Sequence, residues 1–123
     1  MEERRRRTRV PFQGEAEFNV EGAERLKVNV RDLSLSGVYL FSQRKFPVGA
    51  SCRVKLKLIE GSDKLFLELR GRIVRTDEEG MGIKFEEMTP LSFYHLKRLI
   101  EHNMEDPERV EMELVAGGVE LTA

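Results

Sequence analysis

The chain has 123 residues and a mass of 14.2 kDa, enough for one domain to bury a core without disulfides or a structural metal. Hydrophobic residues make up 40% of the chain and charged residues 35%, which predicts a globular protein with a densely charged surface. The single cysteine, Cys52, excludes a disulfide framework and a thiolate metal cluster, and no apolar stretch is long enough for a membrane span or signal peptide, so we expect a soluble cytoplasmic protein.

The formal net charge of -1 hides two segments of opposite charge. Residues 1–10 carry a net charge of +3, and residues 104–123 carry a net charge of -5. Residues 1–9 are polar and lack hydrophobic periodicity, which predicts a flexible basic arm. The acidic C-terminal tail contains a few alternating apolar residues that allow an edge strand, a short helix or no ordered structure. We therefore place the ordered domain at residues 10–103.

From Val10 onward, apolar residues alternate with polar ones, the pattern of strands with one buried face. The first run is broken at Gln13-Gly14, where a bulge is expected, and a turn at residues 21–24 leads into a second run. Four more runs follow, separated by loops and turns, and the first of these, residues 38–41, is apolar throughout. The apolar residues of the six runs are Val10, Phe12, Ala16, Phe18 and Val20; Leu26, Val28 and Val30; Val38, Tyr39, Leu40 and Phe41; Cys52, Val54, Leu56 and Leu58; Leu65, Leu67, Leu69 and Ile73; and Met81, Ile83 and Phe85. Short strands at this spacing predict an antiparallel sheet closed into a small barrel.

The periodicity changes at Thr89-Pro90, which predicts a C-terminal helix. Thr89 can cap the helix, and Pro90 suits its first position. The apolar stripe of this helix consists of Phe93, Leu96, Leu99 and Ile100. We expect the helix to plug or flank the barrel and to end near Asn103.

The stretch from Asp32 to Gly37, with the sequence DLSLSG, follows the second run and carries polar groups suited to a ligand. In an extended chain, Asp32 and Ser34 point to one side while the two leucines point to the other. A carboxylate accepts hydrogen bonds and a hydroxyl can donate or accept, so the pair suits the edge of a purine. Gly37 allows a sharp turn or the close approach of a ligand. The alternative is an Asx or Ser turn, in which these side chains bond only their own backbone.

In the basic arm, Arg5 and Arg9 are the only two arginines spaced four apart, and Arg9 directly precedes the first strand. The planar fork of arginine matches phosphate oxygens and the O6 and N7 acceptors of guanine. Guanine's other edge offers N–H donors, which the carboxylate of Asp32 can accept. Together, the arm and the DLSLSG stretch predict a site for a guanine nucleotide.

Three short motifs occur in order along the chain: Arg5-x-x-x-Arg9, Asp32-x-Ser34-x-x-Gly37 and Gly80-Met81-Gly82-Ile83-Lys84-Phe85. In this order they resemble the motifs of the PilZ domain, the bacterial receptor module for cyclic di-GMP. The resemblance covers about residues 4–103. It implies a mainly β fold, a six-stranded antiparallel split barrel with a C-terminal helix.

The resemblance also implies a binding site. Its residues are Arg4, Arg5, Arg9, Asp32, Ser34 and Gly37. The two motif arginines would clamp the phosphates and guanine edges of the dinucleotide, the second motif would hold a base against the barrel, and Arg4 would add a contact. We expect cyclic di-GMP as the ligand, with no further cofactor and no metal. Ordering of the arm would change a surface read by an unidentified downstream protein, and the receptor would be a monomer or homodimer.

Three alternatives remain from the sequence. The same fold could serve as a protein-interaction module that needs no nucleotide. The arginine arm could instead bind nucleic acid, although the rest of the chain is acidic in balance and offers no tryptophan for stacking. An enzyme is the weakest alternative, because His95 and His102 lack a cysteine or carboxylate clearly arranged beside them. We therefore predict a binding protein without catalytic activity.

Overall fold

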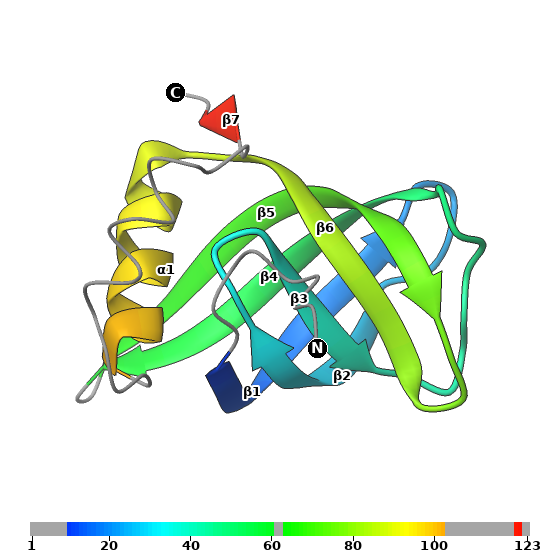
Figure 1. Cartoon of the computed structure of the whole chain (residues 1–123), viewed down its shortest axis with the longest axis horizontal. Coiled ribbons are helices and arrows are strands. Elements are labelled where there is room, and N and C mark those ends of the chain that lie inside the picture. The colour runs from blue at the N-terminus through cyan, green and yellow to red at the C-terminus, as the bar shows by residue number, and fades with distance from the viewer. Residues whose placement is uncertain (1–9, 61–62, 103–119, 122–123) are drawn as a thin grey trace, which may run out of the picture.

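The computed structural model describes residues 10–60, 63–102 and 120–121. Within them the chain forms strands followed by one helix and a short final strand, as Figure 1 shows. The elements are β1 (Val10–Val20), β2 (Leu26–Leu33), β3 (Gly37–Phe41), β4 (Ser51–Glu60), β5 (Asp63–Thr76), β6 (Gly80–Met88), α1 (Pro90–His102) and β7 (Glu120–Leu121).

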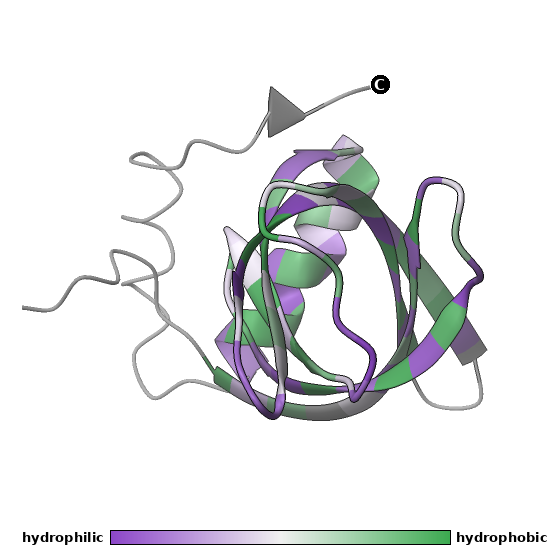
Figure 2. Cartoon of the chain, turned by 90° about the vertical axis from the view of Figure 1, so that its right-hand side faces the viewer, coloured by the Kyte–Doolittle hydropathy of each residue, from purple (hydrophilic) through white to green (hydrophobic). Residues whose placement is uncertain are grey.

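The first six strands form a closed antiparallel barrel. Their order in the sheet is β3-β2-β1-β4-β5-β6, and β3 also pairs with β6, so the sheet closes on itself. Figure 2 shows the resulting ring, with α1 behind one end of it. This confirms the six-stranded antiparallel barrel with a C-terminal helix expected from the sequence.

The strands differ from the predicted runs mainly in length. β2 continues past Arg31 because Asp32 and Leu33 pair with Tyr39 and Val38 of β3. The expected break in β1 is present as a shift of register between Pro11 and Gly14. Strand ends are therefore set by backbone pairing with the neighbouring strand rather than by the last apolar side chain.

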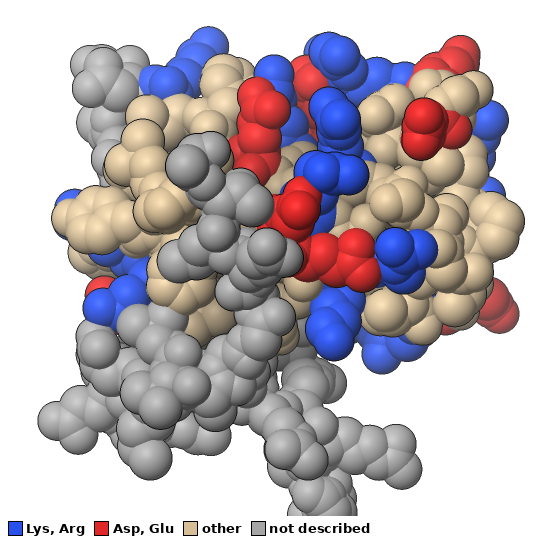
Figure 3. All heavy atoms as spheres, turned by 90° about the horizontal axis from the view of Figure 1, so that it is seen from above, with Lys and Arg blue, Asp and Glu red and all other residues tan. Residues whose placement is uncertain are grey.

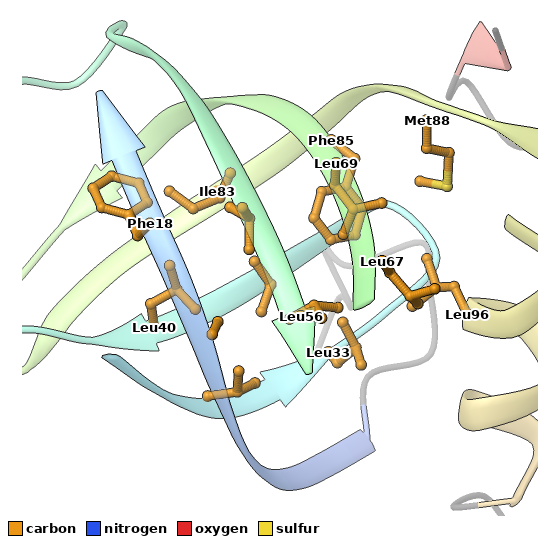
Figure 4. Close-up of a cluster of buried hydrophobic side chains, with 14 of the residues drawn as sticks. Phe18, Leu33, Leu40, Leu56, Leu67, Leu69, Ile83, Phe85, Met88 and Leu96 are labelled. Carbon is orange, nitrogen blue, oxygen red and sulfur yellow. The ribbon is translucent and has the colours of Figure 1, made fainter. Parts of the chain in front are cut away.

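The barrel interior is filled by inward-facing side chains of the six strands (Figure 4). Phe18, Leu40 and Leu56 are fully buried, and side chains of α1 join the same cluster. Cys52 is a buried core residue, as expected, and burial raises the pKa of its thiol to about 12. This thiol is therefore protonated at neutral pH.

α1 begins where the sequence predicted. The Thr89 side-chain oxygen accepts a hydrogen bond from the Ser92 backbone N–H at 3.1 Å, and Pro90 is the first helical residue. Leu96 and Ile100 are fully buried, so the helix packs its apolar stripe against the barrel core. Within the described part of the chain, no helix is long and apolar enough to cross a membrane.

The acidic tail contributes an edge strand at two positions. Glu120 and Leu121 pair in parallel with Glu87 and Met88 of β6. The rest of the tail lies outside the described residues, as does the basic arm, so the predicted domain boundaries remain predictions.

Barrel closure between β3 and β6 requires close backbone contact at Gly80, which yields the first prediction. A Cβ at Gly80 would lie 1.9 Å from the carbonyl oxygen of Leu40, whereas a Cβ at Gly82 would meet nothing nearer than Arg75 at 3.7 Å. Gly80→Ala should therefore lower the free energy of unfolding by about 2 kcal/mol, measured by urea denaturation. Gly82→Ala, the matched control on the same strand, should change it by less than about 0.5 kcal/mol. Equal effects of the two substitutions would contradict this account of closure.

Candidate ligand-binding site

Asp32 lies near the end of β2, beside an irregularity in the pairing of β2 with β3. The register shifts between Val30 and Asp32, and Asp32 pairs with Tyr39. Val30 and Leu33 face the core, so the shift leaves two consecutive residues, Arg31 and Asp32, outside the barrel. The bulge thus places a cation directly beside the predicted ligand-binding carboxylate.

The two side chains are joined by an ion pair. Arg31 Nε donates a hydrogen bond to Asp32 Oδ2 at 2.8 Å, with the side chains 38% and 17% exposed. This bond is the main cause of the raised pKa of Arg31. A second carboxylate, that of Glu79, lies 3.7 Å from Arg31 Nη1. The Asp32 carboxylate is therefore held in a defined position at the barrel surface.

Ser34 is buried, and its hydroxyl is used within the turn between β2 and β3. Its oxygen accepts hydrogen bonds from the backbone N–H groups of Ser36 at 3.2 Å and Gly37 at 3.1 Å, and its own N–H donates to the Gly37 carbonyl at 2.9 Å. Ser34 therefore adopts the Ser-turn geometry that was the alternative from the sequence. The flanking Leu33 and Leu35 point into the core, as predicted. A direct contact from Ser34 to a ligand stays a prediction.

Gly37 is the first residue of β3, and a neighbouring strand approaches it closely. A Cβ at this position would lie 2.5 Å from the carbonyl oxygen of Ile83 in β6. Its φ is not in the left-handed region, which among the described glycines only Gly22 and Gly49 adopt. The sharp-turn explanation offered from the sequence is therefore not what requires glycine here. The absence of a side chain allows β3 and β6 to meet.

Tyr39 belongs to this site, although the apolar run that contains it predicted no role for Tyr39 outside the core. Its neighbours Val38 and Leu40 face the core, whereas Tyr39 is covered on the outer side. The phenol donates a hydrogen bond to Asp77 Oδ1, which also accepts the N–H groups of Glu79 and Gly80 at 3.0 Å each. Burial, aided by this hydrogen bond, raises the pKa of Tyr39 to about 12. The same bond is the main cause of the lowered pKa of Asp77.

Two arginines lie over the Tyr39 ring. The guanidinium carbon of Arg31 is 3.7 Å from the ring centroid, and that of Arg75 is 5.3 Å away. Arg75 pairs with Gly82, which in turn pairs with Tyr39, so the three positions are neighbours across β5, β6 and β3. The sequence signal for Tyr39 was the alternation of inward and outward side chains along residues 38–41. It was hidden because every residue of that run is apolar or aromatic.

The predicted arginines Arg4, Arg5 and Arg9 lie outside the described residues. Their point of attachment is nevertheless defined, because Val10 pairs with Leu33 and Pro11 pairs with Asp32. The backbone therefore enters the barrel next to the carboxylate that was predicted to bind the same ligand.

One face of the molecule carries charges of both signs. Seen from above, positive and negative side chains lie next to one another in a band across the middle of the molecule (Figure 3). Ion pairs such as Arg70–Glu87 at 2.7 Å and Arg72–Glu86 at 3.0 Å join β5 to β6. The described residues contain no cluster of three or more histidine, cysteine or carboxylate side chains able to hold a metal.

Comparisons with known proteins agree on one fold. A family model described as "PilZ domain" matches residues 3–102. Among solved structures, the chain resembles the Bacillus subtilis inhibitor of motility (MotI/DgrA), with a TM-score of 0.69 and 18% identity over 82% of this chain. It covers 51% of that protein, about half its length.

Two further solved structures are PilZ domains by their descriptions. One is the PilZ domain of CeSA from a cellulose-synthesizing bacterium, with a TM-score of 0.57 and 17% identity over 77% of this chain and 96% of that one. The other is the PilZ domain of YcgR from Escherichia coli with c-di-GMP, with a TM-score of 0.63 and 16% identity over 93% of this chain and 98% of that one. At these identities, the similarity establishes a shared fold.

The hydrogen bond from Tyr39 to Asp77 yields the second prediction. Tyr39→Phe should lower the melting temperature near neutral pH by about 3 to 6 °C, because the Asp77 carboxylate loses the buried hydroxyl that donates a hydrogen bond to it. Tyr94→Phe is the matched control, since Tyr94 is 52% exposed on α1, and it should have little effect.

The effect of Tyr39→Phe should depend on pH in a defined direction. The pKa of Asp77 is lowered in the folded protein, so its stabilising contribution is present above the unfolded pKa, about 3.9, and is lost as pH falls through the lower folded pKa. The difference in melting temperature between wild type and Tyr39→Phe should therefore shrink as pH falls below about 4. A difference that stays constant down to that range would contradict the assigned role.

Proposed function

The chain belongs to the PilZ domain family, and we propose that it is a receptor for cyclic di-GMP that performs no chemistry of its own. The observation that carries the proposal is the pairing of Val10 and Pro11 with Leu33 and Asp32. This pairing brings the base of the arginine arm beside the carboxylate of the second motif. A PilZ domain of the same fold has been solved with this ligand, which supports the choice of ligand.

The charges of the two motifs complement different parts of the dinucleotide. The guanine N1–H and amino groups are donors, and the ionised carboxylate of Asp32 is an acceptor at the edge of the barrel. Arg5 and Arg9 supply forked donors for the phosphates and for the O6 and N7 acceptors of guanine. The carboxylate therefore selects guanine, and the arginines contribute most of the electrostatic attraction.

Ser34 and Gly37 act in this site by fixing the turn that follows Asp32. The Ser34 hydroxyl holds the Ser36 and Gly37 N–H groups, and Gly37 lets β3 lie against β6. The turn is also tied to β6 by a hydrogen bond from the Phe85 N–H to the Ser36 carbonyl at 2.8 Å. These hydrogen bonds hold the turn beside Asp32 in place, which reduces the conformational entropy lost when the ligand binds.

The signal is relayed through the basic arm. Ligand phosphates draw Arg5 and Arg9 onto the outer surface beside Asp32, and the arm is fixed over the dinucleotide. The surface around β2 and β3 then differs in shape and charge between the two states. A downstream protein that recognises one of the two states completes the pathway.

The third prediction is selective binding, measured by isothermal titration of the full chain with cyclic di-GMP, cyclic di-AMP and GTP. Cyclic di-GMP should bind saturably and more tightly than the other two, and binding should persist between about 0.05 and 0.2 M salt, because buried hydrogen bonds are screened less than exposed charges. No binding, or equal binding of all three that disappears with salt, would overturn the receptor function. Those results would favour a nucleotide-independent interaction module or a polyanion-binding arm.

Asp32→Asn tests whether cyclic di-GMP binds at the carboxylate of Asp32. It should weaken binding of cyclic di-GMP by at least about tenfold, because charge-assisted hydrogen bonds to guanine are lost. The melting temperature of the ligand-free protein should change little, since the ion pair to Arg31 is partly exposed. Glu24→Gln, at a carboxylate 73% exposed beside Arg44, is the matched control and should bind like wild type.

A further inference from the structure

The guanidinium of Arg31 is stacked on an aromatic ring at the edge of the proposed site. Its central carbon lies over the Tyr39 ring, 3.7 Å from the ring centroid, which is a van der Waals contact distance. Elsewhere on the barrel the corresponding contact is looser, since Arg44 lies 5.0 Å from the Phe46 ring centroid.

Two carboxylates and the Tyr39 ring hold the guanidinium of Arg31 in position. Its Nε is bonded to Asp32 at 2.8 Å, and its Nη1 lies 3.7 Å from a carboxylate oxygen of Glu79. The ring beneath it is fixed in turn by the hydrogen bond from Tyr39 to Asp77. Arg31 is therefore ordered before any ligand arrives, so little side-chain entropy remains to be lost on binding.

The side chain of Arg31 is nevertheless 38% exposed. Tyr39 covers one side of the guanidinium and the carboxylates of Asp32 and Glu79 lie beside it, so a planar ligand would approach from the side away from the ring. A guanidinium plane is a surface on which nucleobases stack. Asp32 and Glu79 partly neutralise the charge of Arg31, so the guanidinium suits a neutral base better than a phosphate. A phosphate at this position would be repelled by the two carboxylates.

We propose that Arg31 is a stacking platform for one guanine base of the ligand, so that the Tyr39 ring, the guanidinium and the base form three layers. This inference rests on the proposed binding of cyclic di-GMP. A cyclic dinucleotide carries two bases, so stacking of one on Arg31 is compatible with pairing of the other with Asp32. The platform contributes affinity from the barrel itself, independently of the basic arm.

The test is Arg31→Lys in the full chain, titrated with cyclic di-GMP. Lysine retains the positive charge, an ion pair to Asp32 and the capacity to bind phosphate, but it has no planar face. The dissociation constant should rise by at least about fivefold, the lower end of the measured range for stacked bases. Arg44→Lys, at the other arginine beside an aromatic ring and a glutamate, is the matched control and should leave the dissociation constant unchanged.

Each outcome decides between explanations. Unchanged binding by Arg31→Lys, with wild type binding normally, would overturn the platform and leave the receptor function intact. Tighter binding would also overturn it, because Arg31 would then compete with the ligand for Asp32. Failure of wild type to bind would remove the proposed function and this inference together. If Arg31→Lys melts well below wild type, Arg31→Gln provides the second variant, and the same loss of affinity is expected from it.

Discussion

Backbone pairing of β3 with both β2 and β6 determines the shape of the barrel and of the candidate site. It closes the barrel, and it succeeds because glycines at positions 37 and 80 leave room for carbonyl oxygens of the partner strands. The same pairing sets the bulge in β2 that exposes Arg31 and Asp32 together. It also turns Tyr39 outward beneath Arg31. The geometry of the candidate site is thus a consequence of how the barrel closes, with no separate loop or insertion needed among the described residues.

Electrostatics constrain what this site can accept. Asp32 and Glu79 would repel the phosphates of a dinucleotide if they stood alone, yet both lie against Arg31. The ion pairs reduce that repulsion and orient the Asp32 carboxylate. Arginines attached next to Val10 can then supply the attraction for the phosphates. In the proposed complex the barrel would contribute selectivity and the arm would contribute charge, so recognition of the base would be separate from recognition of the phosphodiester.

Alternation and helical periodicity were sufficient to predict five of the six strands, the capped helix at Pro90 and the inward direction of Leu33 and Leu35, whereas the strand at residues 38–41 was predicted from a continuous apolar run. They could not predict the position of Tyr39, because residues 38–41 are all apolar or aromatic and its partner Asp77 is 38 positions away. The Arg31 bulge depends on the register between two strands, which no local pattern encodes. Whether the Ser34 hydroxyl faced a ligand or its own turn was likewise undecided by residue type, since both uses need the same group.

The ligand is proposed to bind at the junction of β1, β2 and β3, and backbone amide chemical-shift mapping by NMR can locate it. On titration with cyclic di-GMP, the largest shifts should occur at Val10, at residues 31–37 and at Tyr39. Shifts that centre instead on the hollow lined by Arg53 of β4 and Arg70 of β5 would contradict this location.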